Sequence, residues 1–137
     1  MRFESFQQFK EMASYWVCES VYLRNGMTLR YALYGAAIPK RGHAIILPDR
    51  DEHIEKYSEL AEELAQYEWQ ASVLEWRGQG LSYGNQNLKQ PDDLVNNEIG
   101  WFMTSVADLN EFWKQVWDDK YQKEPVLIIA HGVGGHI

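Results

Sequence analysis

The sequence predicts an α/β fold, in which a β-hairpin leads into a mostly parallel sheet with helices on its faces. Short apolar runs of strand length alternate with longer segments whose apolar residues recur at the helical period. Such alternation is typical of a parallel sheet covered by helices. The hairpin is indicated by Asn25-Gly26 between the first two strand-like runs, because both residues accept the positive φ of a tight turn.

The first third of the chain is expected to hold a helical leader followed by three strands. Phenylalanines recur at helical spacing in residues 3–14, which predicts a short amphipathic helix within a leader of about residues 1–16. The strands are expected over residues 17–23, 27–34 and 43–47. The third of them is a short apolar run that ends at Pro48.

The remainder of the chain alternates helices with strands. Apolar residues recur with a period near 3.6 over roughly residues 52–68, which predicts a helix that Asp49 or Asp51 caps. The other expected elements are a strand around Val73 and Leu74 that ends near Trp76, a turn over 77–80, a polar loop over 83–96, a long helix from about Asn97 to Asp119 and a strand over 126–130.

Composition limits the classes of function. The 137 residues are 45% hydrophobic, which favours one folded domain over a disordered chain. The net charge is -7 and no basic run occurs, so neither nucleic acid nor an anionic membrane surface is an expected partner. The N-terminus lacks the apolar core of a signal peptide, and no apolar stretch approaches the roughly 20 residues of a membrane span. We therefore expect a cytoplasmic protein.

The rest of the chain is organised around Pro125–Ile137, which has the sequence PVLIIAHGVGGHI. Its β-branched run predicts a buried parallel strand that leads into a glycine-rich turn. A strand, a sharp turn and a helix with the pattern small-x-Ser-x-Gly form the nucleophile elbow of serine hydrolases. The residues at the corresponding positions are Ala130, His131, Gly132, Val133 and Gly134, followed by Gly135. Glycine therefore stands where the pattern has its serine.

Together with two further segments, this stretch resembles the N-terminal half of an α/β hydrolase of the bacterial lysophospholipase and monoacylglycerol-lipase-like branch. The segments are WRGQGLS at residues 76–82 and PDRDEHIEKY at residues 48–57, which is similar to the oxyanion-hole segment and the helix after it. The resemblance spans Val17 to Ile137. It implies a single, incomplete domain over residues 1–137, truncated after the elbow strand. It also implies carboxylic-ester hydrolysis without a cofactor, acting on lipid or acyl-ester ligands.

The resemblance also implies where the catalytic parts belong. The nucleophile corresponds to Gly132, the oxyanion hole to the backbone N–H groups of Arg50 and Val133, and the acid and the histidine to loops beyond Ile137. Gly132 has no hydroxyl, so no acyl-enzyme can form there. Asp49 stands where this branch usually has glycine. At ~5 Å from the developing charge its carboxylate would cost on the order of 3 kcal/mol, or about a hundredfold in rate.

These departures leave three hypotheses open. The chain is an ester hydrolase by family that has become an inactive pseudoenzyme, a non-catalytic descendant that binds an acyl ligand or a protein, or the product of a decayed gene. His131 and His136 flank the elbow, but two histidines without a third ligand fall short of a zinc site, so we expect no metal. The apolar strand over 126–130 is expected to be an exposed sheet edge through which the chain dimerises, binds a partner or aggregates.

Overall fold

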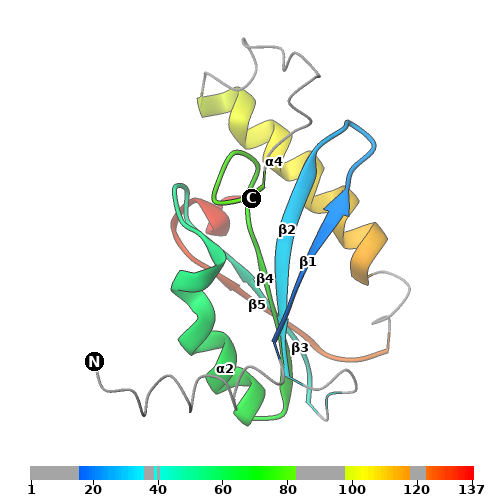
Figure 1. Ribbon diagram of the computed structural model, residues 1–137, viewed down its shortest axis with the longest axis vertical. Coiled ribbons are helices and arrows are strands. Elements are labelled where there is room, and N and C mark those ends of the chain that lie inside the picture. Colours follow the sequence, from blue (N-terminus) through cyan, green and yellow to red (C-terminus); the bar gives the residue numbers. More distant parts are fainter. Residues whose placement is uncertain (1–15, 36–38, 40, 83–97, 118–122) are drawn as a thin grey trace.

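The computed structural model describes residues 16–35, 39, 41–82, 98–117 and 123–137, which fold into one five-stranded sheet with helices on both faces (Figure 1). The strands are β1 (Trp16–Tyr22), β2 (Thr28–Tyr34), β3 (Gly42–Leu47), β4 (Trp69–Leu74) and β5 (Val126–Ala130). The helical elements are the 3-10 turn η2 (Ile54–Tyr57), α2 (Ser58–Gln66), α4 (Glu98–Phe112), the π turn η3 (Trp113–Trp117) and the 3-10 turn η4 (Gly132–Gly135). The expected leader helix and the loop over 83–96 lie outside the described residues.

The sheet confirms the predicted α/β fold class. Its strand order is β1-β2-β4-β3-β5. β2 pairs antiparallel with both β1 and β4, whereas β3 pairs parallel with β4 and β5. Four of the five strands therefore run in one direction, and only β2 opposes them. The carboxyl ends of β3, β4 and β5 consequently point the same way, and the candidate site forms at this end of the strands.

Each face of the sheet has its own apolar core because side chains alternate along a strand. One core joins Leu29, Tyr31 and Leu74 to α4 and η3 through rings such as Phe112 and Trp117. The opposite core joins alternate residues of the same strands to η2 and α2, for example Ile46, Val73, Ile54 and Ala61. α2 and α4 accordingly lie on opposite sides of the sheet (Figure 1).

The β1–β2 connection differs from the predicted two-residue turn. Leu23 N–H donates to the Met27 carbonyl (2.8 Å) and Gly26 N–H donates to the Leu23 carbonyl (3.0 Å), which encloses a three-residue loop. Only Gly26 in this loop takes a positive φ, of 82°. A type I turn followed by one left-handed residue satisfies the twist of a hairpin as well as an Asn-Gly turn does. Asn25 instead accepts a bond from Met27 N–H through its side-chain oxygen.

The helix predicted over 52–68 is shorter, and its predicted caps are wrong. α2 begins at Ser58, after η2, and neither element has a side-chain hydrogen bond at its N-cap. Asp51 takes a left-handed φ of 65°, which turns the chain between Asp49 and the helix. Asp49 is therefore directed elsewhere, toward the turn after β5.

A buried ion pair joins the turn after β4 to α4. Arg77 Nε donates to Asp108 Oδ2 (2.6 Å) and Arg77 Nη2 donates to Asp108 Oδ1 (2.7 Å). The two side chains are only 9% and 1% exposed. Asn25 Nδ2 also donates to Asp108 Oδ1 (3.1 Å), so one carboxylate holds the hairpin loop, the turn and the helix together.

β5 lies at the edge of the described sheet, where it pairs with β3. The strand is parallel, as predicted, but it is not buried, because the described part of the chain leaves its outer edge uncovered. Val126, Leu127 and Ile128 are 40%, 38% and 56% exposed. The expectation of an apolar strand at a sheet edge is confirmed.

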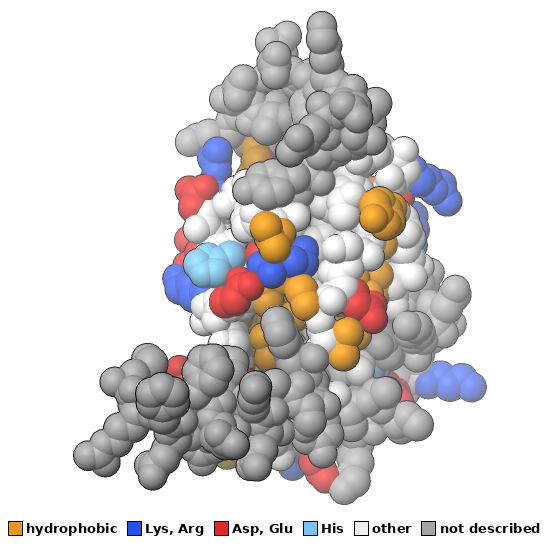
Figure 2. Space-filling model, in the orientation of Figure 1, with side chains coloured by type: hydrophobic (Ala, Val, Ile, Leu, Met, Phe, Trp, Pro, Cys, Tyr) orange, Lys and Arg blue, Asp and Glu red, His pale blue; other side chains and the backbone are white. Residues whose placement is uncertain are grey.

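The described surface carries both acidic and basic side chains on the face drawn in Figure 2. They are interspersed with apolar side chains. Within the described ranges, no helix combines the length and the apolar character needed to cross a bilayer.

Candidate functional site

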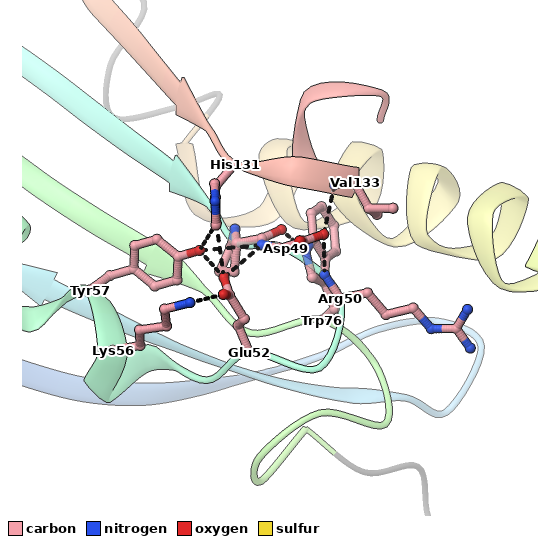
Figure 3. Close-up of polar contacts among 9 residues, drawn as sticks. Asp49, Arg50, Glu52, Lys56, Tyr57, Trp76, His131 and Val133 are labelled. Atoms are coloured by element: carbon pink, nitrogen blue, oxygen red, sulfur yellow. Dashed lines mark hydrogen bonds and ion pairs between the residues drawn. The ribbon is translucent and has the colours of Figure 1, made fainter.

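The candidate site lies where β5 passes into η4, beside the end of β3 (Figure 3). His131 is still extended, with φ -117° and ψ 133°, and its N–H donates to the Leu47 carbonyl of β3 (3.0 Å). The chain then turns sharply at Gly132, which has a φ of 53°. Gly134 N–H closes the turn by donating to the His131 carbonyl (2.9 Å). This strand, tight turn and helical turn have the form of a nucleophile elbow.

Gly134 allows the elbow to lie directly against the end of β3. A Cβ on this buried glycine would overlap the carbonyl oxygen of Leu47 and would lie 2.7 Å from that of Pro48. Gly135 differs, because the nearest atom to its Cβ would be that of Ala130, at 3.9 Å. The two adjacent glycines therefore have different roles. Only at Gly134 does the backbone of β3 come so close that a side chain has no room.

Asp49 occupies the position that the sequence assigned to the oxyanion hole. Its Oδ1 accepts hydrogen bonds from the N–H groups of both Arg50 and Val133, each at 2.8 Å (Figure 3). These are the two N–H groups predicted to bind a developing oxyanion. The Val133 bond, followed by the Arg50 bond, lowers the pKa of the Asp49 carboxyl from its ordinary value. The carboxylate is thus not about 5 Å away and merely repulsive, as we expected, but bound to the donors themselves.

The same carboxylate fills the space that a side chain at position 132 would need. A Cβ on Gly132 would overlap Cγ and both carboxylate oxygens of Asp49. Glycine also accepts the positive φ here without the penalty of a Cβ. The structure therefore links the two departures from the elbow pattern, at positions 49 and 132, by direct contact.

A polar cluster lies beside the Asp49 carboxylate and its two N–H donors (Figure 3). Its members are Glu52, Lys56, Tyr57 and His131. Glu52 accepts hydrogen bonds from Lys56 and from the Tyr57 hydroxyl, and it lies 3.2 Å from His131 Nδ1. The hydroxyl is 3.0 Å from the same nitrogen. Glu52 also accepts from the N–H of Asp49 (3.1 Å), so this cluster holds the backbone that carries the Asp49 carboxylate.

The cluster separates the pKa values of its members. Lys56, and then Tyr57, lower the pKa of Glu52 to about 2. Burial, and then the bond to Glu52, raise the pKa of Tyr57 to about 12. Glu52 is consequently ionised and Tyr57 neutral near pH 7. In the part of the chain that the structure describes, no three His, Cys, Asp or Glu side chains gather as a metal site would require.

Glu52→Gln is expected to flatten the acid side of the stability profile. Because the folded-state pKa of Glu52 lies below the ordinary 4.5, its ionised form stabilises the fold above pH 4.5. This contribution is lost as the pH falls from 4.5 through about 2. Urea-denaturation midpoints of the wild type and the variant should differ at neutral pH and converge in acid. Glu63→Gln on the exposed face of α2 is the control. If the urea midpoint of Glu52→Gln lay below that of the wild type by the same amount at every pH, the ionisation of Glu52 would not be the cause.

The sheet and its flanking helices have the fold of the α/β hydrolases. Residues 38–137 match the family model described as serine aminopeptidase, S33, and the chain belongs to this family. No curated protein matches the sequence.

Solved structures with the same fold include three hydrolases of different kinds. An epoxide hydrolase from Vigna radiata aligns over 90% of this chain with a TM-score of 0.65 and 15% identity. An α/β hydrolase from Novosphingobium aromaticivorans aligns over 88%, with a TM-score of 0.65 and 20% identity. A membrane phospholipase A, described as a bacterial virulence factor, aligns over 98%, with a TM-score of 0.66 and 15% identity. The chain spans about a third of these structures, 32%, 37% and 37% of their lengths, and likeness at this identity shows the fold alone.

Proposed function

We propose that this chain is a catalytically inactive relative of lysophospholipase- and monoacylglycerol-lipase-like carboxylic-ester hydrolases. The segments at residues 48–57 and 76–82 support that branch, and one structural neighbour is a phospholipase A. The observation that carries the proposal is the elbow itself. Gly132 has no nucleophilic atom, and the carboxylate of Asp49 fills the space where one would project.

The chemistry of ester hydrolysis explains why this elbow is inactive. Covalent catalysis needs a nucleophilic side-chain atom, which glycine lacks. Stabilisation of the tetrahedral intermediate needs free N–H donors, and both of the expected donors are bound to Asp49. Removing one such donor from an active enzyme typically costs a factor of about a hundred to a thousand in rate. Two independent requirements are therefore unmet at the same place.

Two buried serines, Ser82 and Ser105, offer no substitute for the missing nucleophile. Ser82 is buried, donates to the Glu75 carbonyl (2.8 Å) and accepts from Arg30 N–H (2.8 Å), so its hydroxyl is committed to the structure. Ser105 is fully buried on α4. A nucleophile must meet both a base and solvent-borne substrate, and neither hydroxyl is exposed to receive one.

Treatment with a serine-directed fluorophosphonate is expected to leave the mass of the protein unchanged. The reason is that the elbow offers no hydroxyl to phosphonylate. Intact-mass spectrometry together with release of p-nitrophenol from short acyl esters measures this, with an active serine hydrolase as the positive control. Gly132→Ser is expected to show no turnover either, because the serine side chain would overlap the Asp49 carboxylate, so the elbow cannot hold a hydroxyl and two free N–H donors in a catalytic arrangement. A stoichiometric adduct or saturable hydrolysis by the wild type would refute the proposal.

We further propose that the chain pairs with a second copy of itself through β5. Among the described residues, β5 pairs with a neighbouring strand on one side only and carries three exposed aliphatic side chains, and a strand at a sheet edge is a template for another strand. Light scattering should show an apparent mass that rises, as the protein concentration increases, from that of one chain to that of two. Ile128→Lys is expected to keep the chain monomeric, whereas Met103→Lys, which replaces another exposed apolar side chain on α4, should not. A wild-type monomer at all concentrations would exclude this mode of association.

A further inference from the structure

We propose that the Asp49 side chain occupies a carboxylate-binding site, and that Asp49 and Gly132 are complementary in size, so that the aspartate at 49 requires a residue without a side chain at 132. The site consists of the N–H groups of Arg50 and Val133, and its ligand class is a monocarboxylate. The tethered carboxylate closes the site against free carboxylates. This inference rests on the proposed function, because it assumes that position 132 carries no nucleophile.

The geometry of the donors is that of an anion-binding site. One oxygen of Asp49 accepts from both N–H groups at 2.8 Å, although the second donor lies 84 residues further along the chain. Hydrogen bonds to an ionised acceptor are shorter and stronger than bonds between neutral groups. A carboxylate that reached these donors from solution would find the same two bonds that Asp49 makes.

The backbone of Asp49 is held in place independently of its side chain. Its N–H lies 3.1 Å from Glu52 Oε2 and 3.3 Å from the Tyr57 hydroxyl. Those groups belong to the polar cluster that also contains His131 of the elbow strand. Removing the Asp49 side chain should therefore leave the two donors where they are, with their acceptor missing.

The two positions are complementary in size as well as in charge. Any side chain at Gly132 would overlap the Asp49 carboxylate, so the aspartate at 49 requires the glycine at 132. Gly78 provides the comparison, because its φ of 75° is also left-handed but nothing lies within 4 Å of its Cβ position. A substitution at Gly78 meets the backbone strain alone, whereas one at Gly132 must also displace the carboxylate.

A tethered group excludes a free one because it is present at a high effective concentration. The wild type should therefore bind a free carboxylate about tenfold or more weakly than a variant without the tethered group. The Glu52 carboxylate faces the same region and is paired with Lys56, which limits its repulsion of an incoming anion.

Amide NMR shifts of Arg50 and Val133 provide the direct test. Wild type, Asp49→Gly and Asp51→Gly are each titrated with acetate, octanoate and neutral octanamide; Asp51 is the exposed neighbour whose loss removes the same charge. We expect the amide signals of Arg50 and Val133 to shift and saturate with acetate and with octanoate in Asp49→Gly, and in neither of the other two proteins. Tighter binding of octanoate than of acetate would indicate an acyl-binding surface beside the site, and equal binding would indicate recognition of the carboxylate only. Equal affinities in the wild type and Asp49→Gly, or no saturation in Asp49→Gly, would overturn the proposal.

A stability cycle tests the complementarity separately. Gly132→Ala should lower the urea midpoint of the wild type more than Gly78→Ala does, and this excess should disappear in the Asp49→Gly background. Asp49→Ala replaces Asp49→Gly if the latter does not fold. Additive losses for positions 49 and 132 would show that the two do not form a unit. Both tests measure binding or stability rather than turnover, so they can fail while the proposed inactivity stands, and the reverse also holds.

Discussion

Gly134→Ala is expected to destabilise the fold by about 3 kcal/mol or more, because the new methyl group has no space. It would overlap the carbonyl oxygen of Leu47, which is backbone and already accepts the N–H of His131. Neither group can move without separating the elbow from β3. Urea denaturation followed by tryptophan fluorescence measures the loss, and the chain contains 6 tryptophans as reporters.

Gly135→Ala is the matched control for that prediction. It adds the same methyl group one residue later, where the nearest atom would be 3.9 Å away. We expect its stability to stay within about 0.5 kcal/mol of the wild type, as for most surface substitutions. Equal losses in both variants would show that the turn disfavours alanine in general and that the contact with β3 is not the cause.

Asp108→Ala is expected to cost about 3–5 kcal/mol, because it leaves the buried guanidinium of Arg77 without its counter-charge. Arg77 makes two short hydrogen bonds to this carboxylate, and Asn25 of the hairpin loop makes a third. The variant therefore releases three segments at once. The change in unfolding free energy from urea titration measures the effect.

Asn110→Ala provides the comparison on the same helix, because Asn110 is exposed. It should change stability by no more than about 0.5 kcal/mol. Arg77→Met combined with Asp108→Leu should recover much of the loss, since replacing a buried ion pair by apolar side chains removes the unpaired charge. A small effect of Asp108→Ala alone would mean that water reaches Arg77.

Much of the fold could be predicted because its signals are local. The strand runs around Ile45, Val73 and Ile128 and the glycines of the elbow are patterns of a few consecutive residues. Four strands lie within about one residue of their predicted bounds, whereas β4 begins at Trp69, before the run predicted around Val73. The cap on the predicted helix was wrong because Asp51 takes a left-handed conformation. A sequence pattern does not show that an aspartate will do so.

The key contact of the site could not be predicted because it is a tertiary contact. Asp49 could be recognised as unusual beside an oxyanion hole, but the distance that we assumed gave repulsion where the structure has two hydrogen bonds. The Glu52–Lys56 pair has the i, i+4 spacing of a helical ion pair and could have been found. The approach of His131 to Glu52 depends on how β5 docks against β3, which local patterns do not specify.

In the described part of the sheet, β5 pairs only with β3, and this has a consequence for the order of folding. Residues His43 and Val126 are paired neighbours, yet on the order of 80 residues separate them, so closing this loop costs about 4 kcal/mol of chain entropy. The hairpin and the β3–α2–β4 unit can form from nearer parts of the chain before that cost is met. We therefore expect the elbow to assemble late, after the rest of the sheet has formed, and amide hydrogens of β5 to exchange with solvent sooner than those of the central strands.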